Sequence, residues 1–316
     1  MSTSLRRYSL LWLGLLTLAS AAVALFVGPV RPATSTIIWE IRLPRVLLGV
    51  LVGSGLAGAG AVFQGALRNP LADPFILGTS SAAATGVMIA GLLTISHYSA
   101  LYFMSLGFAL LSIAVVYRIA RIDGKTPIQT IVLAGVIVSL FFNAAVYLFF
   151  SIFYRESFTV LFYLLGTLTE GNRTLIAISG SIICACFGIC WSFSRELDAL
   201  TQGEETAFHL GIGVETVKKI LFVAASAMVA AAVSVAGMIG FIGLIVPHMM
   251  RMIVGADHRV LIPASAFGGA LFLVLADALA RTIAAPLEIP VGALTALIGS
   301  PYFVYLLRRT QKIGEF

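Results

Sequence analysis

The polar residues that could do chemistry are concentrated in one stretch, residues 195–219 (RELDALTQGEETAFHLGIGVETVKK), of a chain that is otherwise close to continuous hydrocarbon. The stretch holds five carboxylates and three basic side chains: Glu196, Asp198, Glu204, Glu205, Glu215, Arg195, Lys218 and Lys219. Charges of both signs on a short polar segment favour a surface that receives a cytoplasmic protein partner. The alternative is a solvated hairpin between two membrane spans.

This stretch has a predicted local order. Glu204 and Glu205 follow a glycine and fall in the first turn of a predicted helix, where the helix dipole favours negative charge. Ala207 and Leu210 are three residues apart and are predicted to share a face of that helix. The glycines that follow predict its end, and residues 214–219 predict a second short helix. Two short helices joined by a glycine elbow are typical of a docking element.

The three cysteines, Cys184, Cys186 and Cys190, lie together in one apolar run. Cys186 and Cys190 share a helix face, which is the spacing a soft metal ion would need, but no histidine or carboxylate is near them in the sequence. We therefore predict that they pack as small apolar side chains and that the chain has no metal site. The chain also lacks H-E-x-x-H and G-x-S-x-G motifs, so we expect it not to be an enzyme.

One glycine motif resembles a nucleotide site without its context. Residues 53–58 read G-S-G-L-A-G, a literal G-x-G-x-x-G, but a dinucleotide site needs this motif after a strand. Here it lies in a long apolar run that continues through Gly60, so close helix packing explains it better. No G-x-x-x-x-G-K-[ST] motif occurs, so this chain is not expected to bind ATP through a P-loop.

Composition excludes a soluble protein. Of the 316 residues, 59% are hydrophobic and 11% are charged, against about 25% charged in soluble domains. The net charge of +6 is spread over short loops without a basic, aromatic-rich patch, so nucleic acid is not expected as a partner. We predict an all-α integral membrane protein, with residues 1–316 forming a single transmembrane domain.

Apolar runs predict about ten transmembrane helices. Their approximate limits are 8–28, 46–66, 76–95, 100–118, 128–150, 174–194, 220–238, 240–255, 260–281 and 290–307. The first run has a basic start and a small-residue end, as a signal peptide would, but it is long enough to span and is interpreted as an uncleaved helix.

With the N-terminus inside, fourteen of the 20 Lys and Arg residues fall on the cytoplasmic side and six outside, which satisfies the positive-inside rule. Both termini and residues 195–219 are then cytoplasmic. Of the outside arginines, Arg42 and Arg45 precede the second span and Arg281 ends the ninth. They are either snorkelling anchors or a receptor surface for an acidic partner.

Several strings resemble the FecCD family, the permease subunits of bacterial ABC importers for iron chelates, haem and cobalamin. They are RLPR at 42–45, NPLADP at 69–74, GEETAFHLG at 203–211, FIGLIVPHMMRMIVGADHR at 241–259 and LEIPVGALTALIGSPYFVYLLRR at 287–309. The resemblance runs from about residue 40 to the end. It implies the type II ABC importer permease fold, in which spans two to five and seven to ten are pseudo-repeats.

The resemblance also implies three sets of functional residues. The residues expected to contact the ATPase are Leu200, Gly203, Glu204, Glu205, Ala207, Leu210 and Gly211. The residues expected to dock the binding protein are Arg42, Arg45 and Arg281. The residues expected to form the cytoplasmic gate are Asn69, Leu71, Ile128 and Gln129.

The implied assembly is a homodimer of the permease with two cytoplasmic ATPase subunits, which bind ATP and Mg, and a periplasmic or lipid-anchored binding protein. The setting is the lipid of the bacterial inner membrane, and this chain itself carries no cofactor. The expected cargo is a ferric siderophore, the family's commonest substrate, with haem, cobalamin or an oxyanion as alternatives. An ion-coupled secondary transporter is the competing class. Such proteins commonly need ionisable groups inside their spans, and Asp277 is the only carboxylate clearly inside a predicted span. Arg281 follows one turn later, which predicts an ion pair with Asp277 on the helix face.

Overall fold

The computed structural model describes residues 3–29, 34–93, 97–153, 157–168 and 172–313. Within these ranges the chain is helical and forms no named strand. The helices are α1 Thr3–Phe26, η1 Ile37–Arg42, α2 Leu43–Ala66, η2 Pro74–Leu77, α3 Thr79–Leu92, α4 Tyr98–Ala120, α5 Ile128–Ile152, α6 Ser157–Leu165, α7 Arg173–Ser192, α8 Ser194–Thr201, α9 Glu204–His209, α10 Val214–Ala236, α11 Ile242–Val254, α12 His258–Ala280 and α13 Val291–Ile313.

Each of the ten predicted spans coincides with an apolar helix. Seven are long and apolar enough to cross a membrane, and the other three are the shorter apolar helices α3, α11 and the 291–305 part of α13. α3 has 14 residues and α11 has 13, or about 20 Å of helix, less than the roughly 30 Å of a bilayer core.

Irregular backbone precedes both short helices. Residues 67–78 lead into α3 and contain η2, while residues 237–241 lead into α11. Gly237 has φ +70°, and a Cβ there would lie 2.2 Å from the carbonyl oxygen of Tyr163, so glycine is required. Most residues of these two segments are buried or half-buried in protein, which allows their backbone to depart from a helix. The pairs α2–α3 and α10–α11 thus share a pattern of long helix, irregular segment and short helix.

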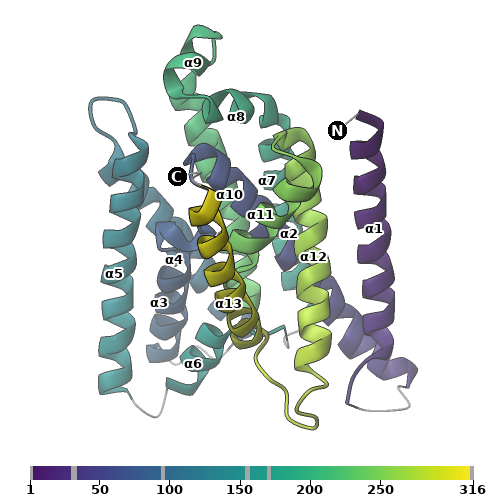
Figure 1. Ribbon diagram of the computed structural model, residues 1–316. Coiled ribbons are helices and arrows are strands. Elements are labelled where there is room, and N and C mark those ends of the chain that lie inside the picture. The colour runs from purple at the N-terminus through teal and green to yellow at the C-terminus, as the bar shows by residue number, and fades with distance from the viewer. Residues whose placement is uncertain (1–2, 30–33, 94–96, 154–156, 169–171, 314–316) are drawn as a thin grey trace.

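Two central helices organise the bundle. The apolar windows of α2 and α10 are 78% and 72% buried, and α2 packs against α12, α10, α11 and α7. α1 lies at the periphery against α12 (Figure 1), and its window is 11% buried. α2 and α10 are therefore the core of the fold.

Small residues allow this central packing. A Cβ on Gly53 would lie 2.3 Å from the carbonyl oxygen of Gly269 in α12, and one on Gly60 would lie 1.9 Å from that of Gly243 in α11. The interpretation of the G-x-G-x-x-G run as a helix-packing surface is confirmed.

The polar stretch differs from its prediction at both ends. Residues 194–201 form α8, which the sequence reasoning left without a helix, and residues 214–219 are the first turns of α10 rather than a separate helix. The start of α1 and the end of α13 lie on the half of the molecule that carries α8 and α9 (Figure 1).

Candidate functional site

The predicted docking stretch folds into a unit of two helices at one end of the molecule (Figure 1). α8 packs against α2, α12 and α9, with Leu197 and Leu200 buried beneath it. α9 follows Gly203, with φ +125°, and is closed by Gly211, with φ +80°. Because other residues rarely adopt these conformations, the two glycines determine where the chain can bend around α9.

α9 has one buried and one exposed face. Ala207 is fully buried, whereas Phe208 and Leu210 are 69% and 67% exposed. The expectation that Ala207 and Leu210 share a face is wrong, because Leu210 is the C-cap residue, where the chain leaves the helix. Glu205 is also exposed. Large apolar side chains exposed at a polar end are typical of a protein contact.

A buried lysine joins this unit to two other segments. The Nζ atom of Lys218 donates to the carbonyl oxygen of Thr126 at 2.9 Å and pairs with Glu204 at 3.1 Å and with Glu215 at 2.6 Å. The Lys218 side chain is 1% exposed. The backbone N–H and the hydroxyl of Thr126 donate to Glu215 at 2.9 and 2.6 Å. One cation therefore holds together α9, the start of α10 and the segment just before α5.

A second polar link fixes α8 to α12. The Oδ1 atom of Asp198 accepts from the backbone N–H of His258 at 3.1 Å and lies 2.6 Å from Nδ1 of the same residue. His258 is buried under Gly65 of α2, where a Cβ would lie 2.6 Å from its Nε2 atom. The two-helix unit is thus attached to the central bundle as well as to α10.

Asn69 and Leu71 lie in the turn between α2 and α3. Oδ1 of Asn69 accepts from the backbone N–H of Leu71 at 2.9 Å, and Oδ1 of Asp73 caps η2 by accepting from Phe75 at 2.7 Å. Burial raises the pKa of the Asp73 carboxyl, while the Phe75 N–H lowers it. Asn69 is exposed and Leu71 is half-buried, so both remain accessible in a rigid turn.

Ile128 and Gln129 lie in the first turn of α5, half-buried and exposed respectively. η2 packs against α5 about two turns further along, where a Cβ on Gly135 would lie 2.3 Å from the carbonyl oxygen of Ile76. The structure therefore joins the two predicted gate segments through one contact between η2 and α5. Their role as a gate stays a prediction.

The three arginines assigned to docking lie inside the protein at the opposite end. Arg45 pairs with Asp277 at 2.9 Å and with Glu288 at 2.7 Å, and Arg281 pairs with Asp277 at 3.0 Å. Arg42 donates to the carbonyl oxygen of Leu25 at 3.0 Å. The ion pair predicted between Asp277 and Arg281 is confirmed.

The expectation that these arginines are exposed charges is wrong. Arg42, Arg45 and Arg281 are 4%, 8% and 3% exposed, because each guanidinium reaches back to cap neighbouring carbonyls or to neutralise a carboxylate. Arg281 also donates to the carbonyl oxygens of Val27 and Ala24, so the cluster ties the end of α1 to α12. Their part in docking stays a prediction.

The sequence gives no specific contact or role for four residues of the site: Lys218, Phe208, Asp198 and His258. Lys218 and Glu215 are three apart at the start of an apolar run, a spacing at which a basic residue can fold back on an acid. Nothing in the sequence indicated that Lys218 also reaches Thr126 across 92 residues. For the apolar Phe208, its place between two glycines in a polar stretch was the available signal.

Apolar helices packed around the buried pair α2 and α10, with a folded polar unit at one end, are the architecture of a multi-pass membrane protein. The profile of the FecCD transport family matches residues 8–309, so the chain belongs to that family. It is therefore a permease of the type II ABC importer class.

Comparison with individual proteins gives a consistent result. The chain is 43% identical over 295 residues to the cobalamin import system permease protein BtuC of Halobacterium salinarum, covering 93% of this chain and 78% of that protein. It is 40% identical over 282 residues to the hemin transport system permease protein HmuU of Yersinia pestis, covering 87% and 84%. A solved structure described as an inward-facing metal-chelate type ABC transporter matches with a TM-score of 0.87 and 32% identity, over 96% of this chain and 99% of that one.

Proposed function

We propose that this chain is the membrane-spanning subunit through which a metal chelate crosses a bacterial inner membrane by alternating access. Residues 1–316 act as one transmembrane unit, with both termini in the cytoplasm. Two copies of the chain pair with two ATPase subunits, which bind ATP and Mg²⁺, and with one binding protein on the far side. This chain contributes the path and its gates.

The observation that carries the proposal is the buried contact of Lys218 with Glu204 and Thr126. An ATPase docked on Phe208 and Leu210 would move α9 when it closes on ATP. Because Lys218 joins α9 to the segment before α5, that movement would reach the gate residues Ile128 and Gln129. Such a mechanism needs a structural element with two conformations, one of which the ATPase favours. We propose that the compact ion-paired joint around Lys218 is this element.

The binding protein is proposed to dock at the end that carries Arg42, Arg45 and Arg281. These side chains are paired within the chain, so their contribution is to hold the surrounding segments in position for docking. Exposed charges at this end include Glu40 and Arg173, which pair with each other at 2.8 Å. Exposed pairs of this kind influence docking orientation and association rate more than affinity.

The proposed cargo is a ferric siderophore. A metal chelate agrees with the description of the matched solved structure. The two relatives named above carry cobalamin and hemin in their names, so these two ligands are the direct competitors, with an oxyanion as a third.

The test is uptake by the transporter reconstituted in proteoliposomes with its ATPase and binding protein. Labelled ferric siderophore, haem, cobalamin and molybdate are offered separately, and we expect ATP-dependent uptake of the siderophore. A different preferred ligand would correct the cargo alone. Uptake driven by an ion gradient without the ATPase would replace the ABC mechanism with an ion-coupled one.

A further inference from the structure

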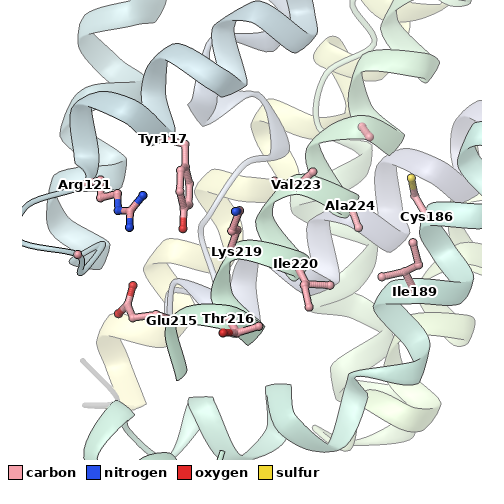
Figure 2. A pocket seen from close by; sticks show the side chains of 12 residues that line it. Tyr117, Arg121, Cys186, Ile189, Glu215, Thr216, Lys219, Ile220, Val223 and Ala224 are labelled. Atoms are coloured by element: carbon pink, nitrogen blue, oxygen red, sulfur yellow. The ribbon is translucent and has the colours of Figure 1, made fainter. Parts of the chain in front are cut away.

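A groove of about 590 Å³ lies between α4, α7 and α10 on the half of the molecule that carries α9 (Figure 2). Tyr117 and Arg121 contribute from the end of α4, Ile189 from α7, and Lys219 and Val223 from α10. Apart from Glu215, which belongs to the joint made by Lys218, its lining residues have none of the roles assigned above to coupling, gating or docking.

The rim of the groove is positively charged. Arg121 and Lys219 are exposed, and the described residues give neither of them a carboxylate partner. Glu215, the acid among the lining residues, is engaged instead by Lys218 and Thr126. The hydroxyl of Tyr117 adds a hydrogen-bond donor at the same rim (Figure 2). Lys218 is shared by Glu204 and Glu215, so that cluster carries a net charge of −1, and Arg121 with Lys219 leave the rim as a whole positive.

The remainder of the groove is apolar. Ile189 and Val223 are 42% and 46% exposed, and the lining continues along α10 to Ala227. Lys219 and Ala227 are eight residues apart, which corresponds to about 12 Å along the helix. The cations lie at the end of the membrane spans, and the apolar wall lies directly beyond them. This order corresponds to a phospholipid, in which a charged headgroup is followed by acyl chains.

We propose that this groove binds an anionic phospholipid, with its phosphate between Arg121 and Lys219 and its acyl chains against Ile189 and Val223. The proposal rests on the orientation proposed above, which puts the rim at the cytoplasmic leaflet, where anionic lipids attract basic residues. The lipid would hold α4 against α10 next to the joint made by Lys218.

Two other occupants have to be distinguished from a phospholipid. A soluble anion would satisfy the cations but leave the apolar wall uncovered. A second copy of this chain would have to cover that wall with its own helices, and the cross-linking experiment below tests for it.

The test uses the assembled transporter in phosphatidylcholine nanodiscs that contain a trace of phosphatidylglycerol with a photoreactive group in one acyl chain. We expect the label on peptides of α4, α7 and α10 that line the groove. The double variant Arg121→Gln and Lys219→Gln should reduce this labelling about tenfold. Arg118→Gln with Arg308→Gln is the matched control, since both residues are exposed and neither lines the groove, and it should label as the wild type does.

Equal labelling by a phosphatidylcholine probe, or labelling insensitive to Arg121→Gln and Lys219→Gln, would overturn the proposal. A disulfide between two protomers through Val223→Cys would assign the groove to a second copy instead. The labelling needs neither ATP nor cargo, so its failure can be distinguished from failure of the transport proposal.

Discussion

The ammonium group of Lys218 lies 2.9 Å from the carbonyl oxygen of Thr126, a residue 92 positions earlier in the chain. Lys218 is almost fully buried, and Glu204 and Glu215 balance its charge. A buried cation is tolerated only when it is paired and hydrogen-bonded, so these three acceptors hold the lysine in one position. The result is a rigid joint between the proposed ATPase-binding helix and the segment that precedes α5.

Removing this joint should uncouple ATP hydrolysis from transport. Lys218→Met leaves two carboxylates facing each other without their cation, and we expect a loss of about 2 kcal/mol in stability, since the acids are only about a third exposed. Uptake should fall much more than ATPase activity. Lys125→Met is the control, because Lys125 is exposed and should leave the melting temperature unchanged. A melting temperature of Lys218→Met equal to that of the wild type would contradict the assigned joint.

The apolar tip of α9 should carry the affinity for the ATPase. Phe208→Ser combined with Leu210→Ser removes two exposed apolar side chains, so folding should be unaffected while co-purification of the ATPase falls at least tenfold. Ala207→Leu is the contrasting variant, since Ala207 is fully buried and overpacking there should cost about 1–3 kcal/mol in stability. Full recovery of the ATPase with the double variant would show that docking occurs elsewhere.

Glu204 and Glu205 are neighbours with different roles. Glu205→Lys reverses an exposed charge and should weaken ATPase association without changing stability. Glu204→Lys places a second cation beside Lys218 and should lower the melting temperature of the permease alone. Both measurements are made on purified permease, with and without the ATPase. Identical effects of the two substitutions would argue against this assignment.

The arginine cluster at the opposite end should act first on stability. Arg45→Ala leaves Asp277 in a buried site with one cation instead of two, and we expect a loss of about 1–3 kcal/mol because Arg281 still neutralises the carboxylate. Arg173→Ala is the matched control at the same end, because its pair with Glu40 is about 60% exposed on both sides and should contribute about 0.2–1 kcal/mol. Thermal unfolding in detergent measures both. If Arg45→Ala and Arg173→Ala both lowered stability by the same small amount, Arg45 would contribute no more than an exposed surface charge.

The gate assignment can be tested by cross-linking. In a background where the three native cysteines are replaced by serine, Asn69→Cys and Leu71→Cys should each form a disulfide between two protomers in the nucleotide state that closes the path. Ala72→Cys is the control, because Ala72 is buried at 1% exposure and should not cross-link. Absence of a cross-link at positions 69 and 71 in every nucleotide state would move the gate to another segment.

The sequence by itself determined the class of the protein and the positions of the ten longer apolar helices that the structure describes. Apolar runs of about twenty residues in a chain with few charges need no tertiary information, because each helix satisfies its own backbone hydrogen bonds in lipid. Gly53 and Gly60 likewise predicted close packing, since a missing Cβ restricts the local geometry whatever the partner is. The family resemblance added predicted positions for ATPase coupling, the gate and docking.

Only the tertiary structure decided which charges are exposed. The sequence presents Arg42 and Arg45 as surface charges because their partners lie on other helices, up to 232 residues away. Arg281 pairs with Asp277 on its own helix, but it also reaches the carbonyl oxygen of Ala24, 257 residues away. The same holds for Lys218, whose acceptor Thr126 precedes a different span. A local sequence pattern predicts which residues share a face of one helix. The burial of a long basic side chain depends instead on the position of a carboxylate or carbonyl group on another helix, which the local pattern does not contain.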